Sequence, residues 1–302
     1  MNLIKVKKII EYLNDIEELV ECKGAEVSTV EGFSSIYDSI PNTISWMRSQ
    51  NIDWDNVHAT LIFCDRNCVP PEKEMQKRRF VKVNDPRYTF FNTLTKFSKS
   101  GKKKNIHMSA VIHESAEIGN NCYIGPNVVI GKNVGILKGT EIHANVVIED
   151  NVKIGEDCII YPGAVLGITG FGHQKGKTNR LERVEHIGGV TLGNSVEIGS
   201  NTCVARGNIS DTMIGNNSKI NSLCHIAHNV KIGNNVGISV GVMIAGSVII
   251  EDNVWVAPGS VIKNSVNIKK GAFIGLGSVV IKDVDEITTV AGVPARILEK
   301  QM

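Results

Sequence analysis

The sequence predicts a mainly β protein in which a triangular parallel β-helix follows a small α/β domain. Two observations favour this fold class. An aliphatic residue returns at every sixth position from Ile214 to Val280, and the same ladder occupies the middle of the chain from Ile106 to Leu166. A period of six fits neither an α-helix, which repeats about every 3.6 residues, nor a half-buried strand, in which buried and exposed residues alternate with a period of about two. The period therefore indicates a repeat architecture.

Each six-residue repeat is expected to form one flat face and a corner, so that three repeats complete a coil of about eighteen residues. The aliphatic side chains then point inward and stack at the strand spacing of roughly 4.8 Å. Gly and Asn repeatedly follow the aliphatic residue, as in Ile118-Gly119-Asn120 and Ile232-Gly233-Asn234. These residue types tolerate turn conformations, so we expect them at the corners. The repeats predict between about eight and nine coils.

Two interruptions break the ladder. The segment 167–190 is too irregular for the triangular β-helix, called the prism below, and is predicted to leave it as an extruded loop. The segment 205–213 shifts the register of the repeat by about four residues.

The sequence divides into three predicted parts: 1–104, 105–284 and 285–302. The first lacks the six-residue period and is expected to be an α/β domain that binds a nucleotide or nucleotide sugar. It begins with an amphipathic helix, contains strands at 58–63 and 79–83 and a helix at 86–97, and ends in a basic linker at 99–105. The second part is the β-helix, and the third is a C-terminal tail.

The composition is that of an ordinary soluble protein. The chain has 302 residues, 42% of them hydrophobic, and a formal net charge of +2. A charge this close to zero gives no argument for nucleic acid or membrane as partner. The N-terminal stretch is too charged for a signal peptide or a membrane span, so we expect the cytoplasm. Seven cysteines without metal-ligand spacing favour reduced, structural thiols.

A histidine pair, His225 and His228, lies in the ladder on either side of the inward Ile226. One coil later, the backbone stacked on His228 belongs to Gly246. A neutral imidazole can take a proton from an attacking amine, and a nearby Gly N–H can donate to the oxygen of a collapsing thioester. The alternative is that His228 merely caps a corner of the repeat.

A zinc-dependent enzyme is a second alternative, because trimeric β-helices can hold zinc with three histidines across a subunit interface. Such a site requires another histidine on a neighbouring coil. One coil above the pair stand Met243 and Gly246. We therefore expect no metal site.

Several motifs resemble the UDP-3-O-acylglucosamine N-acyltransferases of lipid A synthesis. In the repeat region they are Gly170-Phe-Gly-His173, Val196-Glu-Ile-Gly-Ser-Asn-Thr202 and the segment 225–233; in the N-terminal part they are Gly32-Phe-Ser-Ser35, Ile40-Pro-Asn-Thr-Ile-Ser-Trp46 and Val83-Asn-Asp-Pro-Arg87. The resemblance implies a homotrimer of left-handed β-helices with active sites between subunits. This handedness is an exception to the usual right-handed crossover.

The resemblance implies roles for single residues. His228 matches the general base and Gly246 the backbone oxyanion donor. Trp46 matches an aromatic residue that stacks on uracil. The second stacking aromatic of the family has Ile52 in its approximate place, although Trp54 could substitute.

Near the sugar, Asn221 replaces an acidic residue of the family, which leaves the identity of the sugar open. The C-terminal segment from Gly275-Leu276-Gly277 onward resembles instead the nucleotide-sugar N-acetyltransferases of the same superfamily. That resemblance implies acyl-coenzyme A as co-substrate, with its pantetheine arm near the turn at Gly275, Leu276 and Gly277, and with Arg296 near phosphate. No tightly bound cofactor is expected.

These patterns together predict a cytoplasmic homotrimeric N-acyltransferase that moves a short acyl group, of acetyl or hydroxybutanoyl type, from acyl-coenzyme A to a nucleotide-linked amino sugar for a surface polysaccharide such as an O-antigen. The extruded loop, with His173 and four basic residues, would close over the cleft of a neighbouring subunit. Three alternatives stay open: a lipid A enzyme that uses acyl carrier protein, a zinc-dependent hydratase, and a non-catalytic binding prism.

Overall fold

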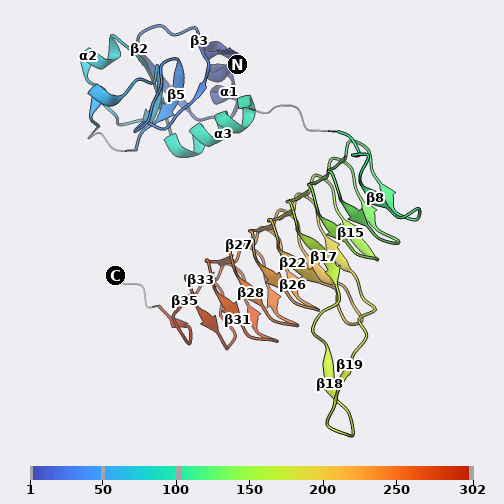
Figure 1. Cartoon of the computed structure of the whole chain (residues 1–302). Helices are drawn as coiled ribbons and strands as arrows, with labels where there is room; N and C mark the ends of the chain where they lie inside the picture. Colours follow the sequence, from blue (N-terminus) through green and yellow to red (C-terminus); the bar gives the residue numbers. More distant parts are fainter. Residues whose placement is uncertain (1–2, 49–51, 99–103, 299–302) are drawn as a thin grey trace. The chain divides into compact units, whose positions relative to one another are not determined.

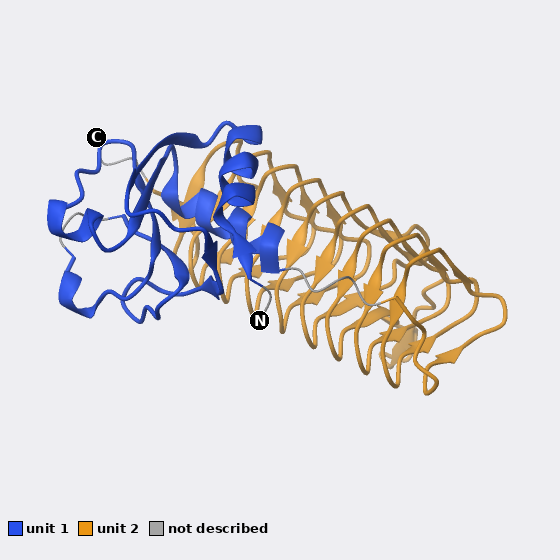
Figure 2. Ribbon diagram, turned by 90° about the horizontal axis from the view of Figure 1, so that it is seen from above, with its two compact units in different colours: residues 1–102 blue, residues 103–302 orange. Residues whose placement is uncertain are grey.

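In the computed structural model, residues 3–48, 52–98 and 104–298 are described, and the chain divides into two units, 1–102 and 103–302 (Figure 2). The predicted basic linker falls largely on residues 99–103, outside the described residues. No helix within the described ranges is long and apolar enough to cross a membrane.

The first unit is an α/β domain built on a five-stranded sheet with the order β2-β7-β6-β5-β4. Its strands are β2 (Leu19–Gly24), β4 (Gly32–Phe33), β5 (Thr43–Trp46), β6 (Leu61–Asp65) and β7 (Arg79–Val83), with β1 (Ile4–Lys5) and β3 (Thr29–Val30) paired separately. Its helices are α1 (Val6–Asp15), α2 (Glu72–Met75), α3 (Pro86–Ser98) and the 3₁₀ turn η1 (Trp54–Asn56). The predicted strands and helices are therefore present.

The two faces of this sheet bury separate hydrophobic clusters. Phe63 packs on one face together with Trp46 and residues of α1 and α3. Its neighbour in sequence, Ile62, packs in the other cluster with Trp54 and Phe80. Successive side chains of a strand point to opposite faces. Trp46 and Trp54 thus belong to opposite sides of the sheet, and Trp54 does not stand opposite Trp46 as a second stacking residue.

The second unit is a parallel β-helix whose three faces are sheets of ten, nine and eight described strands (Figure 1). The ten-stranded face contains β10 (Tyr123–Ile124), β13 (Glu141–Ile142), β16 (Ile159–Ile160), β21 (Glu197–Ile198), β24 (Lys219–Ile220), β27 (Gly237–Ile238), β30 (Trp255–Val256), β33 (Phe273–Ile274), β35 (Thr289–Ala291) and the antiparallel β36 (Arg296–Ile297).

The other two faces are formed in the same way. The nine-stranded face contains β8 (Val111–Ile112), β11 (Val129–Ile130), β14 (Val147–Ile148), β17 (Val165–Ile168), β22 (Cys203–Ala205), β25 (His225–Ile226), β28 (Met243–Ile244), β31 (Val261–Ile262) and β34 (Val279–Val280). The eight-stranded face contains β9 (Glu117–Ile118), β12 (Gly135–Ile136), β15 (Val152–Ile154), β20 (Val190–Leu192), β23 (Thr212–Ile214), β26 (Lys231–Ile232), β29 (Ile249–Ile250) and β32 (Asn267–Ile268).

The aliphatic ladder forms the core of this unit, as predicted. Ile130 pairs in register with Ile148, eighteen residues later, and Ile226 with Ile244. All four side chains are buried. The fold class, a left-handed parallel β-helix made of six-residue repeats, is confirmed.

The corners use Gly and Asn for two different reasons. Asn121, the third residue after Ile118, has a φ of 60°, a left-handed conformation that Asn tolerates better than most residues. Gly119, the first residue after Ile118, does not have a positive φ. A Cβ there would lie 2.7 Å from the backbone nitrogen of Lys138 on the next coil. Asn is therefore favoured by the turn, and Gly by the close approach of coils.

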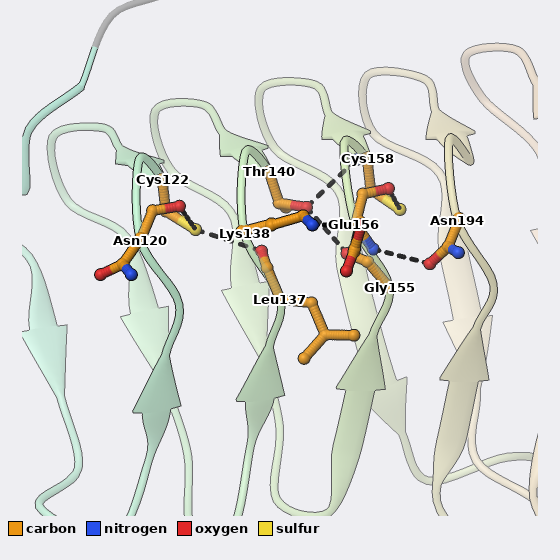
Figure 3. Close-up of polar contacts among 9 residues, drawn as sticks. All are labelled: Asn120, Cys122, Leu137, Lys138, Thr140, Gly155, Glu156, Cys158 and Asn194. Atoms are coloured by element: carbon orange, nitrogen blue, oxygen red, sulfur yellow. Dashed lines mark hydrogen bonds and ion pairs between the residues drawn. The ribbon is translucent and has the colours of Figure 1, made fainter.

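Small polar side chains bridge successive coils near one edge of the prism (Figure 3). The Cys122 thiol donates to the carbonyl oxygen of Leu137 at 3.2 Å, and the Thr140 hydroxyl donates to Gly155 at 2.9 Å. Cys158 repeats the contact with Gly193 at 3.1 Å. All seven cysteines are free thiols. The thiols of Cys122 and Cys158 act as structural hydrogen-bond donors between coils.

Both predicted interruptions change the course of the chain. The first projects from the prism as a hairpin of β18 (His173–Lys175) and β19 (Leu181–Arg183) (Figure 1). The second adds four residues, so that Val204 pairs with Ile226 instead of with a residue eighteen positions later. At the C-terminal end, β35 pairs with β33, and the segment predicted as a tail continues the ten-stranded face.

Candidate active site

His228 lies at the corner that follows β25, and Gly246 lies at the same corner one coil later, after β28. The amide of Ser247 donates to the carbonyl oxygen of His228 at 3.0 Å, which fixes the two corners against each other. A Cβ on Gly246 would lie 2.6 Å from Cε1 of His228 and 2.9 Å from its Nε2. The imidazole therefore lies against the Gly246 backbone, as the period of eighteen predicts.

The Gly246 N–H is available as a donor. Its neighbours Ala245 and Ser247 both donate to backbone carbonyls, whereas the Gly246 amide has no acceptor in the described part of the chain. At other corners the amide at the equivalent position donates to a side chain of the next coil. The Lys132 amide, for example, donates to Asp150 Oδ1 at 2.7 Å. A free N–H beside a histidine can donate to an oxyanion while the ring accepts a proton.

A cavity of about 310 Å³ opens beside these two residues. It is lined by Phe171, His225, Ala227, His228, Met243, Ile244, Ala245, Gly246, Val261 and Ile262. Most of this lining is apolar, and it follows the outer side of the nine-stranded face. Phe171 comes from the extruded loop and is 84% exposed. The site thus joins two histidines, His225 and His228, and one free amide to an apolar surface.

A second histidine, His186, stands beside the candidate base, and the sequence analysis missed it. Its ring centroid lies 5.4 Å from that of His228, edge to face, and its side chain is buried. His186 belongs to the extruded loop, which has no repeat period. No spacing rule therefore places it, although a lone histidine just before the ladder resumes at Val190 is a signal that could have been weighed.

Burial, with a smaller contribution from His186, lowers the pKa of His228 below its ordinary value of 6.5. A general base works only when it is neutral, so activity is lost only when the pH falls below this lowered pKa. We expect kcat/KM to be flat near pH 7 and to decrease on an acid limb centred below pH 6.5. A pH profile of kcat/KM measures this limb, and a midpoint at or above 6.5 contradicts the assignment.

Asn221 lies at a different corner, after β24, and does not join His228 within one chain. It lines a separate cavity of about 610 Å³ on the ten-stranded face, together with Tyr161 and Trp255. Its side-chain oxygen accepts the amide of Ser222 at 2.7 Å. Contact of Asn221 with a sugar stays a prediction.

His173 and Trp46 also lie apart from the base. His173 is exposed in β18, where its ring contacts Phe171 with centroids 4.7 Å apart. Trp46 belongs to the first unit, is half-buried and packs edge to face against Phe91 at 6.5 Å. Their roles in substrate binding stay predictions.

The structure brings the predicted coenzyme residues near one another. A Cβ on Gly275 would lie 2.7 Å from the Cβ of Ala291, and Ala291 pairs with Arg296 across the β35–β36 ribbon. Leu276 is exposed, and Gly277 has a φ of 62°. This corner forms the opposite edge of the nine-stranded face from His228. Across residues 3–48, 52–98 and 104–298, no group of three or more His, Cys, Asp or Glu residues is placed to hold a metal ion.

Comparison with known proteins identifies the family of this chain. The family profile "GMPPB C-terminal domain" matches residues 106–212, and "Bacterial transferase hexapeptide (six repeats)" matches residues 211–246. The solved UDP-N-acetylglucosamine acyltransferase of Francisella novicida is 32% identical, with a TM-score of 0.58, over 64% of this chain and 68% of that one. The chain belongs to the hexapeptide-repeat acyltransferases.

Two further members of this family are similar. The LpxA structure from Acinetobacter baumannii is 30% identical, with a TM-score of 0.57, over 64% of this chain and 73% of its own. The UDP-3-O-acylglucosamine N-acyltransferase of Leptothrix cholodnii is 48% identical over 67 residues, which are 21% of this chain and 18% of that protein. The aligned segment thus spans less than a fifth of this curated relative.

Proposed function

We propose that this hexapeptide-repeat acyltransferase transfers a short acyl group from acyl-coenzyme A to the amine of a nucleotide-linked amino sugar. The observation that carries the proposal is the contact between the His228 ring and the Gly246 backbone, whose N–H is free, beside an apolar cavity.

The reaction follows from these groups. The sugar amine attacks the thioester carbonyl, and a C–N bond forms. The Gly246 N–H donates to the oxyanion, and His228 accepts the proton that the amine loses. The C–S bond then breaks, and His228⁺ returns the proton to the departing thiolate. Direct transfer of this kind needs no covalent intermediate on the protein.

The nine-stranded face supplies a path for the acyl donor. His228 lies at one of its edges and the corner of Gly275 and Gly277 at the other. Between them the outward side chains of Met243 and Val261 are apolar and about half exposed. We place the acyl group and pantetheine arm along this surface, with Arg296 toward the phosphates. In a homotrimer, the extruded loop would close on a neighbouring subunit, and the first unit would hold the nucleotide through Trp46.

A thiol-release assay tests the proposed function. The purified protein is combined with acetyl- or hydroxybutanoyl-coenzyme A and a panel of UDP- and dTDP-linked amino sugars. We expect thiol release that requires both partners. Binding of a nucleotide sugar with no turnover from any donor would instead identify a non-catalytic prism.

A second candidate function is the UDP-3-O-acylglucosamine N-acyltransferase reaction of lipid A synthesis. The 48% identity to the Leptothrix cholodnii enzyme of that name favours it. The assay therefore includes a long-chain hydroxyacyl-acyl carrier protein as donor. Transfer from the carrier protein alone would replace coenzyme A in the proposal by this donor.

Phe171 provides a test of where the acyl group lies. We expect Phe171→Ala to raise KM for the acyl donor several-fold with little change in kcat, because the variant removes one wall of the cavity and leaves both reacting groups in place. Initial rates against donor concentration give both constants. Leu181→Ala, in the same hairpin and also exposed, is the control. Equal effects of the two substitutions would show that Phe171 does not contact the donor.

A further inference from the structure

Three buried polar atoms without hydrogen-bond partners belong to the candidate base and to two residues around it. Six buried side-chain atoms lack a partner in the described ranges, and three of them are His186 Nε2, Asn208 Oδ1 and His228 Nδ1. The other three lie in the N-terminal unit. Buried polar atoms are almost always paired, with protein or with ordered water. A concentration of unpaired atoms at one place indicates a shared partner.

Backbone contacts hold the three residues together. The two imidazole rings are 5.4 Å apart at 73°. The backbone carbonyl oxygen of Asn208 accepts a hydrogen bond from the Ile187 backbone amide at 2.8 Å, and the Asn208 backbone amide donates to Asn229 Oδ1 at 2.7 Å. Asn208 is thus fixed between the residues that follow the two histidines. The two rings and the backbone of Asn208 thus lie where the extruded loop rejoins the prism.

The hydrogen-bonding roles of these atoms are complementary. Nδ1 of His186 lies 2.9 Å from the Val184 carbonyl oxygen, which can only accept, so Nδ1 carries the hydrogen and Nε2 keeps a lone pair. Asn208 Oδ1 is also an acceptor. His228 Nδ1 is buried, so Nε2 is the nitrogen that can serve the cavity as base. A neutral His228 with a free Nε2 lone pair must carry its hydrogen on Nδ1. The cluster therefore offers one donor and two acceptors.

We propose that His186 and Asn208 are positioning residues that hold His228 in its base-competent tautomer through one buried water. The water accepts the His228 Nδ1–H and donates its two hydrogens to His186 Nε2 and Asn208 Oδ1. Three hydrogen bonds are typical of a buried water in a protein. The inference rests on the proposed function, because it takes His228 as the base, and it extends that function to residues that never touch the substrate.

The loop glycines fit this role. A Cβ on Gly172 would lie 2.3 Å from His186 Cε1, and a Cβ on Gly170 would lie 3.2 Å from both His186 Nε2 and His228 Cδ2. Side chains at these positions would push the two rings out of place. The loop thus positions His186 beside His228, and the conformation of the loop determines the geometry of the site.

The direct test reads the tautomer of His228 without any substrate. The full-length protein is labelled with ¹⁵N-histidine, and imidazole nitrogen shifts are recorded above the titration of His228. We expect the Nδ1–H form in the wild type and a mixture rich in the Nε2–H form in His186→Leu and Asn208→Leu. An unchanged tautomer in both variants overturns the proposal. His186→Gln, which offers an amide oxygen as acceptor, keeps the test available if the leucine variants do not fold.

Kinetics give the second readout. We expect kcat to fall roughly 10–100-fold in His186→Leu and Asn208→Leu, less than on loss of the base itself, with KM nearly unchanged and with partial rescue in His186→Gln. Glu185→Gln, an exposed neighbour, is the control. If the tautomer depends on His186 but His228→Ala is fully active, the proposed function is wrong and the water-linked cluster is supported. If the tautomer is unchanged in both variants but His228→Ala is inactive, the water-linked cluster is wrong and the proposed function is supported.

Discussion

Replacement of His228 by Ala is expected to lower kcat by about 10²–10⁴-fold, because the variant removes the group that takes the proton from the attacking amine. His186, whose ring lies 5.4 Å from that of His228, is buried and does not line the cavity. It cannot substitute for the base without a movement of the loop. The variant should keep its fold, since the His228 side chain is half-buried and makes no hydrogen bond within the described residues. Turnover in the thiol-release assay and the thermal unfolding midpoint measure the two effects separately.

His113 offers a matched control for this experiment. It follows Ile112 on the same nine-stranded face, near the opposite end of the prism, and its Nδ1 contacts the Ser115 hydroxyl at 2.9 Å. We expect His113→Ala to have wild-type kcat. Near-normal turnover in His228→Ala would rule out His228 as the base, whereas equal losses in both variants would point to damage of the prism.

The fold and the core of the site follow from the sequence because the repeat is local. Each inward aliphatic residue fixes its own coil, and the coil length of eighteen then places Gly246 on His228 with no further information. Few folds allow a contact between two distant positions to be read from counting alone. The four-residue insertion before Thr212 shifts the register on the N-terminal side of His228 but not on its C-terminal side. The predicted contact between His228 and Gly246 is therefore unaffected.

The features that could not be predicted are those that depend on tertiary packing. His186 reaches the base from a loop whose path depends on packing against Gly170 and Gly172, and no spacing rule describes that path. The corner glycines were explained by turn conformation, although the positive φ belongs to the third residue after the aliphatic position. In each case the missing information is tertiary.

Gly246→Ala is the second substitution with a large expected effect. The new Cβ would lie 2.6 Å from His228 Cε1 and 2.9 Å from Nε2, closer than real side-chain atoms approach. The methyl group must push the imidazole away from the free amide, which itself remains. A displacement of about 1 Å at a reacting group can cost roughly 10²-fold in rate, so we expect kcat to fall by about that factor.

The backbone permits this substitution, which makes the result interpretable. Gly246 does not have a positive φ, so alanine brings a steric effect and not a conformational one. Gly135→Ala is the matched control, because Gly135 also lies in the prism without a positive φ, and nothing lies within 4 Å of the added Cβ. We expect Gly135→Ala to retain wild-type turnover and Gly246→Ala to lose it, with similar unfolding midpoints for both. Full turnover in Gly246→Ala would mean that catalysis does not depend on contact between the His228 ring and the Gly246 backbone, which contradicts the proposed arrangement of the base.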